Sequence, residues 1–144
     1  MSEPISNEIA LHEAAHCVAA LRHEIGVRHV SVDGEVALNP PGDLLEQGRH
    51  HGAVALGYAV VALAGQAAAP TTEMSKSDQQ LLEHSVFLGS WGDDPDTMRR
   101  ALSALAALFV QHHRKEIEKL ALVLHERGSM SGTEVEEYLG SVRK

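Results

Sequence analysis

The segment from Ile5 to Ala20 constrains the fold more than any other, because its apolar and histidine positions recur at the period of an α-helix. Within this segment His12 and His16 are four residues apart, so a helix places both imidazoles on one face, one turn apart. The two histidines belong to the five-residue pattern His-Glu-x-x-His, at residues 12–16. With 10 histidines in 144 residues, this pattern arises by chance in roughly one such chain in fifteen. The helical context therefore matters as much as the pattern.

The ends of this helix can be predicted from capping residues. Ser6 or Asn7 is a suitable N-cap, and Gly26 is a suitable stop after the last apolar position. We therefore expect a helix over residues 6–24.

The pattern His12-Glu13-Ala14-Ala15-His16 is typical of metallopeptidases. Two neutral imidazoles at this spacing can bind one tetrahedral Zn²⁺, which leaves room for a third protein ligand and a water molecule. Glu13, next to the first ligand, is placed to take a proton from that water as a general base. The motif predicts a zinc-dependent hydrolase, with His12 and His16 as ligands and Glu13 as the catalytic residue.

Composition excludes several other classes of function. The net charge of −8 argues against a nucleic-acid partner, because such proteins neutralise phosphates with clustered Lys and Arg. Cys17 is the only cysteine, so an intrachain disulfide framework is excluded, and we expect it to be a small buried hydrophobe. The first residues are acidic and contain no apolar signal segment, which favours a cytoplasmic location.

The uncharged stretch from Gly52 to Thr72 is long enough to cross a bilayer. It consists mostly of Ala and Gly, whose transfer into lipid is much less favourable than that of Leu or Ile. We therefore predict a buried core helix over about 52–69, ended by Pro70, and no membrane span.

The rest of the chain predicts a mainly α (α+β) domain. After the first helix, residues 27–38 alternate as a β-hairpin does, with Asp33-Gly34 as its turn. Further helices are expected over about 78–88, 95–127 and 132–142. Their boundaries are predicted from Ser77 and Asp94-Pro95 as helix starts, Gly128 as a stop, and a capping box over residues 131–134.

The order of these elements, and not only the zinc motif, resembles the peptidase domain of the FtsH family of ATP-dependent proteases. Residues 9–16 resemble the family's His-Glu-Ala-Gly-His helix, with Ala15 in place of the glycine. Residues 63–68 resemble its Gly-Arg-Ala-Ala-Glu segment, and Ser77-Asp78 stands where the family has Ser-Asn-Asp. The similarity continues through Ser90-Trp91-Gly92, residues 113–121 and residues 132–135.

The resemblance implies that residues 1–144 form one zinc metallopeptidase domain and that Asp78 is the third zinc ligand. An Asp at a helix start is also a common way to stabilise the helix dipole, so its role depends on the resemblance. Glu73, Glu83 and His84 lie nearby in sequence and remain alternative ligands.

Two departures from the family bear on substrate and partners. Gln66 and Ala69 replace the family's Arg and Glu, and no phosphate-binding loop of an ATPase occurs in the sequence. We therefore expect substrates to be peptides or already unfolded segments, with a separate ATPase or adaptor as a partner. The resemblance also implies assembly into a homo-oligomer.

Three hypotheses follow. The first is a stand-alone zinc endopeptidase whose substrate pairs as an extended strand with residues 30–32 or 35–38. The second is a non-catalytic zinc-binding adaptor or oligomerisation domain derived from such a peptidase, which would not need the general base Glu13. The third is another short peptidase with the same motif, of the type that cleaves bacterial repressors.

Overall fold

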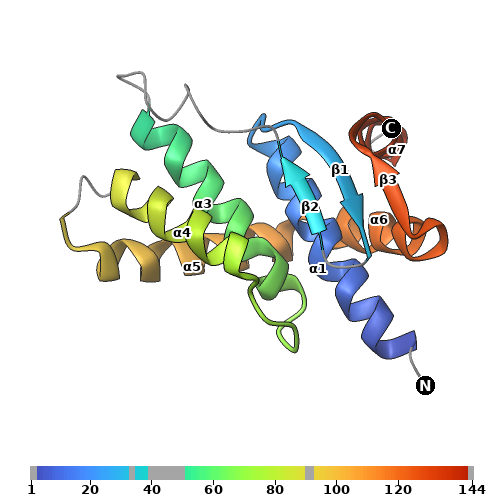
Figure 1. The fold of residues 1–144 in the computed structure, drawn as a ribbon, viewed down its shortest axis with the longest axis horizontal. Helices are drawn as coiled ribbons and strands as arrows, with labels where there is room; N and C mark the ends of the chain where they lie inside the picture. Colours follow the sequence, from blue (N-terminus) through green and yellow to red (C-terminus); the bar gives the residue numbers. More distant parts are fainter. Residues whose placement is uncertain (1–2, 33–34, 39–50, 90–92, 143–144) are drawn as a thin grey trace.

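The structure, a computed structural model, describes residues 3–32, 35–38, 51–89 and 93–142 (Figure 1). Within these ranges the chain is mainly helical with one small antiparallel sheet, as the sequence predicts. The elements are α1 (Glu3–Arg22), β1 (Val27–Ser31), β2 (Glu35–Leu38), α3 (His51–Ala68), α4 (Lys76–Gly89), α5 (Pro95–His112), α6 (Arg114–Arg127), β3 (Ser129–Ser131) and α7 (Gly132–Val142).

The start of α1 differs from the prediction. The helix begins at Glu3, so Ser6 and Asn7 lie inside it and the predicted N-cap is wrong. Pro4 falls in the first turn, where its missing N–H would have had no helical acceptor, so the proline does not interrupt the helix.

The end of α1 is a Schellman motif centred on Glu24 rather than on Gly26. Glu24 adopts a left-handed backbone with φ 60°, and the N–H of Ile25 donates to the carbonyl of Ala20 at 2.8 Å. Ile25 is buried, as is typical of the apolar residue that follows such a helix end. The burial of Ile25 helps to stabilise the unfavourable φ of Glu24.

The sheet has the strand order β2-β1-β3, so β1 is its central strand. β1 and β2 pair antiparallel as the predicted hairpin, whose Asp33-Gly34 turn lies outside the described residues. β3 was not predicted: it follows Gly128, whose φ of 82° ends α6 as expected, and pairs with β1 through Val30 and Met130. Because β1 is paired on both sides, residues 30–32 are not a free edge, and that part of the substrate prediction is wrong.

α3 is the central element of the helical layer and contacts α1, α4 and α5 (Figure 1). One side packs into the main core with α1, α6, α7 and the sheet, and the other forms a second core with α4 and α5. Its small residues allow this, because helices with Ala and Gly at their contacts approach closely. The predicted buried helix is confirmed, and none of the described helices is long and apolar enough to cross a bilayer.

Two of the predicted N-terminal caps are present. Asp94 accepts a hydrogen bond from the backbone N–H of Thr97, and Ser131 and Glu134 form the reciprocal bonds of a capping box. α4 differs, because Ser75 rather than Ser77 caps it by accepting the N–H of Asp78 at 3.1 Å.

The helix predicted over 95–127 is two helices, α5 and α6, separated at His113. No Pro or Gly occurs at this junction. The break instead coincides with a change of packing partner, because α5 lies on α3 whereas α6 lies on α1. Side-chain contacts hold the junction: His113 stacks on Phe109, and the buried Glu116 forms an ion pair with Arg22 of α1.

Candidate metal centre

α1 directs His12 and His16 toward α3, where both are almost fully buried. Their Nε2 atoms lie 3.0 Å apart. The backbone of Gly65 on α3 lies directly against them, since a Cβ there would be 2.5 Å from the Nε2 of His16 and 2.6 Å from that of His12. The two ring nitrogens therefore converge in a confined space between the helices.

Hydrogen bonds determine which nitrogen of each ring carries the proton. His16 Nδ1 lies 2.6 Å from the Val61 carbonyl, which can only accept, so Nδ1 donates. His12 Nδ1 lies 2.6 Å from the hydroxyl oxygen of Thr72, and that hydroxyl donates its own proton to the Ala69 carbonyl, so His12 Nδ1 also donates. In the neutral rings both Nε2 atoms therefore present lone pairs, which is the tautomer that metal-binding histidines require.

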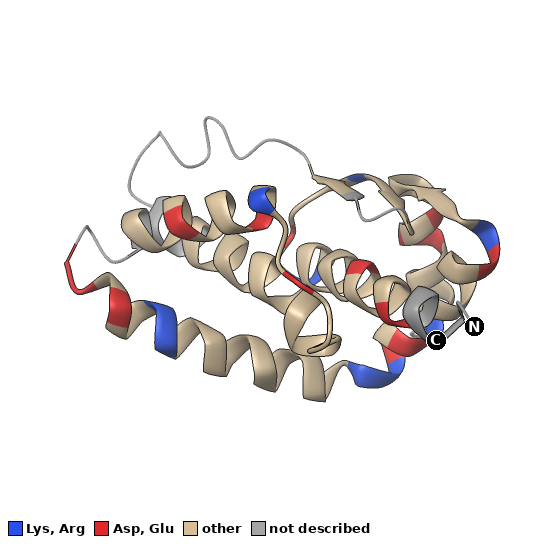
Figure 2. Cartoon of the chain, turned by 60° about the horizontal axis from the view of Figure 1, so that its bottom comes forward, with Lys and Arg blue, Asp and Glu red and all other residues tan. Residues whose placement is uncertain are grey.

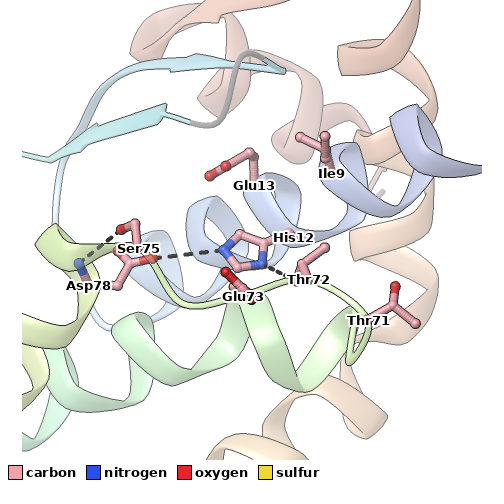
Figure 3. A pocket seen from close by; sticks show the side chains of 8 residues that line it. All are labelled: Ile9, His12, Glu13, Thr71, Thr72, Glu73, Ser75 and Asp78. Atoms are coloured by element: carbon pink, nitrogen blue, oxygen red, sulfur yellow. Dashed lines mark hydrogen bonds and ion pairs between the residues drawn. The ribbon is translucent and has the colours of Figure 1, made fainter. Parts of the chain in front are cut away.

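Asp78, in the first turn of α4, supplies a third electron-rich atom to the same point (Figure 3). Its Oδ2 lies 3.1 Å from the Nε2 of His16 and 3.8 Å from that of His12. Bonds of about 2.0–2.1 Å from a tetrahedral Zn²⁺ place ligand atoms about 3.3 Å apart, close to these separations. Two lone pairs and a carboxylate that face one another repel unless a cation or proton lies among them, so these residues fit a divalent metal.

The proximity of these side chains shifts the pKa values of Asp78 and His16. Burial alone would raise the pKa of Asp78, but the hydrogen bonds and charges of His12 and His16 in their protonated forms outweigh it and lower the pKa far below its ordinary range. Burial would lower the pKa of His16, but the hydrogen bond and charge of Asp78, with the charge of Glu13, outweigh it and raise the pKa. In the metal-free protein, a proton on His16 thus compensates part of the negative charge.

This pair predicts how the stability of the metal-free protein depends on pH. The raised pKa of His16 contributes stability below its ordinary value of 6.5, and this contribution is lost as pH rises through the folded-state value. The lowered pKa of Asp78 contributes stability above its ordinary value of 3.8, which is lost only at much lower pH. We therefore expect the pair to stabilise the metal-free fold more at about pH 5 than at pH 8.

Urea unfolding of the metal-free protein and of Asp78→Asn at both pH values measures this contribution, because the substitution removes the pair. Zinc should reverse the trend, since only unprotonated imidazoles bind it. The expectation is contradicted if the free-energy difference between the two proteins is the same at both pH values.

Glu13 lies beside this group, on the same helix, and is buried. Its carboxylate and the ring nitrogens of His12 and His16 all lie within 4.8 Å of one another, so distance alone would also allow Glu13 to be a ligand. The Oδ2 of Asp78 lies 3.1 Å from the Nε2 of His16, so two carboxylates lie close enough to the rings to bind the same metal. If one of them binds a metal there, the other could act as a base.

An open cleft of about 360 Å³ leads to the site. It is lined by Ile9, His12, Glu13, Thr71, Thr72, Glu73, Ser75 and Asp78 (Figure 3). A molecule from solvent can therefore approach both Glu13 and the metal-binding atoms from one side.

The alternative ligands are placed less favourably. Glu73 is exposed on the connection between α3 and α4 and lines the cleft. Glu83 forms an ion pair with Arg99, and His84 is exposed on α4. No ion pair or hydrogen bond links any of these three side chains to His12 or His16 among the described residues.

Sequence reasoning did not identify three other groups of the site: Thr72, the Val61 carbonyl and Gly65. Thr72 and Val61 orient the imidazoles, and Gly65 leaves room for them. Gly65 belongs to the segment that carries the family resemblance, and this was the available signal. Gln66, which replaces the family's Arg, is exposed, and its side chain donates to the carbonyl of Thr72.

Comparison with protein-family models finds no family that matches this chain, and comparison with curated proteins finds no significant match. The assignment of function therefore depends on the geometry of the site.

The third ligand can be tested directly by metal affinity. We expect Asp78→Asn to weaken zinc binding by more than about 100-fold, because it removes a ligand rather than a group that orients one. Glu73→Gln and Glu83→Gln should change affinity by no more than a few fold. Competition with a chromogenic chelator measures all four proteins, and a loss of affinity in Glu73→Gln but not in Asp78→Asn would assign the role to Glu73.

Proposed function

We propose that this protein is a zinc-dependent endopeptidase that hydrolyses peptide bonds in peptides or unfolded segments. The observation that carries the proposal is the convergence of three groups at a single point. Two are imidazoles whose Nδ1 carries the proton and whose Nε2 can bind a metal, and the third is a carboxylate. A second carboxylate, Glu13, stands beside them in a cleft open to solvent.

In this proposal His12, His16 and Asp78 hold zinc, which when bound lowers the pKa of water and polarises the scissile carbonyl. Glu13 takes the proton of the attacking water and delivers it to the leaving amine. Thr72 and the Val61 carbonyl fix the ring orientations, so the site is organised before substrate binds. The burial of Glu13 and both rings leaves little of their surface in contact with water, which strengthens these interactions.

The substrate would bind as an extended chain along the cleft. β2 is an edge strand of the sheet, and Figure 1 places it on the side nearer α4. Main-chain pairing with β2 would hold a peptide with little dependence on its sequence. A folded protein offers few such strands, which favours unfolded segments as substrates.

We further propose that the domain is of the FtsH peptidase type. What supports this is the order of α1, the hairpin, α3 and α4, together with Asp78 at the start of α4. A separate ATPase or adaptor would then deliver substrates.

The decisive experiment is cleavage by the zinc-loaded protein. We expect it to cut a quenched peptide library or a reduced, alkylated protein, to lose this activity in 1,10-phenanthroline, and to regain it when zinc is restored. If fully zinc-loaded protein cuts neither substrate, the proposal is wrong.

The second candidate is a zinc-binding domain that only mediates association. It is favoured by α5, whose outer face is uncharged from Ala101 onward and exposes Leu105 and Leu108 by 53% and 62%. Association through α5 is compatible with catalysis. The open cleft beside Glu13 favours a catalytic site, because purely structural zinc sites are usually closed by four protein ligands. Measurement of both molecular mass and cleavage separates the two candidates.

A further inference from the structure

The cleft beside the metal centre is lined by acidic side chains and, among the described residues, by no Lys or Arg. Glu13 and Asp78 have roles at the centre, but Glu73 has none in the chemistry proposed above. It is exposed and lines the cleft together with His12 (Figure 3). Glu8 adds a further carboxylate nearby, because it accepts a hydrogen bond from the hydroxyl of Thr71.

Within the described residues, the Lys and Arg side chains do not line this cleft. Lys76, close to Glu73 in sequence, lines a different depression with Gln79, Gln80 and Glu83. Figure 2 shows acidic segments on α1 and on the connection into α4, and basic segments at the start of α4, near the start of α5 and where α5 meets α6. A second cleft, at the junction of α5 and α6, is lined by Arg22, Arg114, Lys115 and Lys119, together with Glu116 and Glu118. Within the described part of the chain, no Lys or Arg forms an ion pair with Glu73.

The metal itself does not cancel this charge. Glu8, Glu13, Glu73 and Asp78 contribute four negative charges, and a divalent ion offsets two of them. The rim therefore keeps a negative potential when the centre is loaded, and the net charge of −8 extends it over the surface. A cleft of one sign attracts substrates of the other sign and disfavours those of the same sign.

We propose that the cleft selects extended peptides with a Lys or Arg side chain next to the bond that is cut, and that Glu73 is the residue that receives this positive charge. Ile9 supports the same specificity, because it offers an apolar wall for the aliphatic stem of Lys or Arg while the charged end remains in water. This inference rests on the proposed peptidase function and adds the substrate class.

Binding and cleavage of matched peptides test the inference separately. Three fluorescent peptides would be used that are identical except for Lys, Gln or Glu at the position beside the bond cut in the library. Binding would be measured by anisotropy with zinc-loaded Glu13→Gln protein, which holds peptides without hydrolysing them. Cleavage of the same peptides would be measured with the protein that retains Glu13.

The Lys peptide should bind and be cut about fivefold better than the Gln peptide, as expected for one partly exposed charge pair, and the Glu peptide should be the poorest. Adding Glu73→Gln should abolish the ratio between Lys and Gln peptides, and Glu73→Lys should invert the order. Glu136→Gln is the matched control, because it removes an equal charge from the exposed surface of α7 and should leave the ratio intact. The preference should also decrease as salt is raised to 1 M.

Equal binding of the three peptides would overturn the inference, as would a Lys preference that survives Glu73→Gln. A Lys preference in binding without any cleavage by zinc-loaded protein would overturn the peptidase function and leave the charge selectivity of the cleft supported. Cleavage of all three peptides at equal rates would support the peptidase function and overturn the charge selectivity of the cleft.

Discussion

Glu13→Gln is expected to lower kcat for peptide cleavage by about 10²–10⁴-fold, the range typical for removal of a general base. Glutamine has nearly the same shape but cannot take a proton from water. Glu13 is 5% exposed and lies within the helix that carries both histidines, so an isosteric change avoids a cavity in the core. Because Asp78 is the carboxylate ligand in the proposed site, zinc should remain bound at a 1:1 ratio.

The measurement combines single-turnover cleavage with metal analysis of the same sample. Glu24→Gln is the control, since Glu24 is an exposed acid just beyond the end of the same helix and should have wild-type kcat. Loss of zinc in Glu13→Gln would mean that Glu13 is a ligand, and undiminished cleavage would mean that another group is the base.

Gly65→Ala is expected to weaken zinc binding strongly without removing any proposed ligand. A Cβ at this position would lie 2.5 Å from His16 Nε2 and 2.6 Å from His12 Nε2, in the space into which the metal-binding nitrogens point. On an ordinary helix, Gly→Ala stabilises by about 1 kcal/mol. Here we expect a net loss of about 1–3 kcal/mol from overpacking, together with at least about 100-fold weaker zinc binding.

Gly57→Ala provides a matched control on the same helix. Its Cβ would meet the side chain of His23 at 3.4–3.7 Å, which is ordinary contact. This variant should be as stable as the wild type or more so, with unchanged zinc affinity. Calorimetric titration with zinc and thermal unfolding distinguish the two positions, and equal zinc binding by both variants would contradict the geometry described for the site.

The elements that were predicted correctly depend on neighbouring residues in the chain. The alternating apolar residues of 27–38 sufficed for the hairpin, and Ser131 with Glu134 sufficed for the last cap. The incorrect predictions concern elements whose ends or existence depend on contacts with residues distant in the sequence. The periodicity of α5 continues into α6, so the break at His113 follows only from the different packing partners of the two helices. β3 is three residues long and forms because β1 is available beside it.

The same distinction separates the parts of the candidate metal centre. The helical pattern of α1 was sufficient to place His12, Glu13 and His16 together, because a helix brings residues three and four apart onto one face. Asp78 was 62 residues beyond His16 (78 − 16) and could be proposed only through a family resemblance; in the tertiary structure its carboxylate reaches that histidine. The positions of Thr72, the Val61 carbonyl and Gly65 around the two rings follow only from the packing of distant segments. Ring tautomers, room for a metal and access from solvent depend on how α1, α3 and α4 pack, and no local pattern encodes that packing.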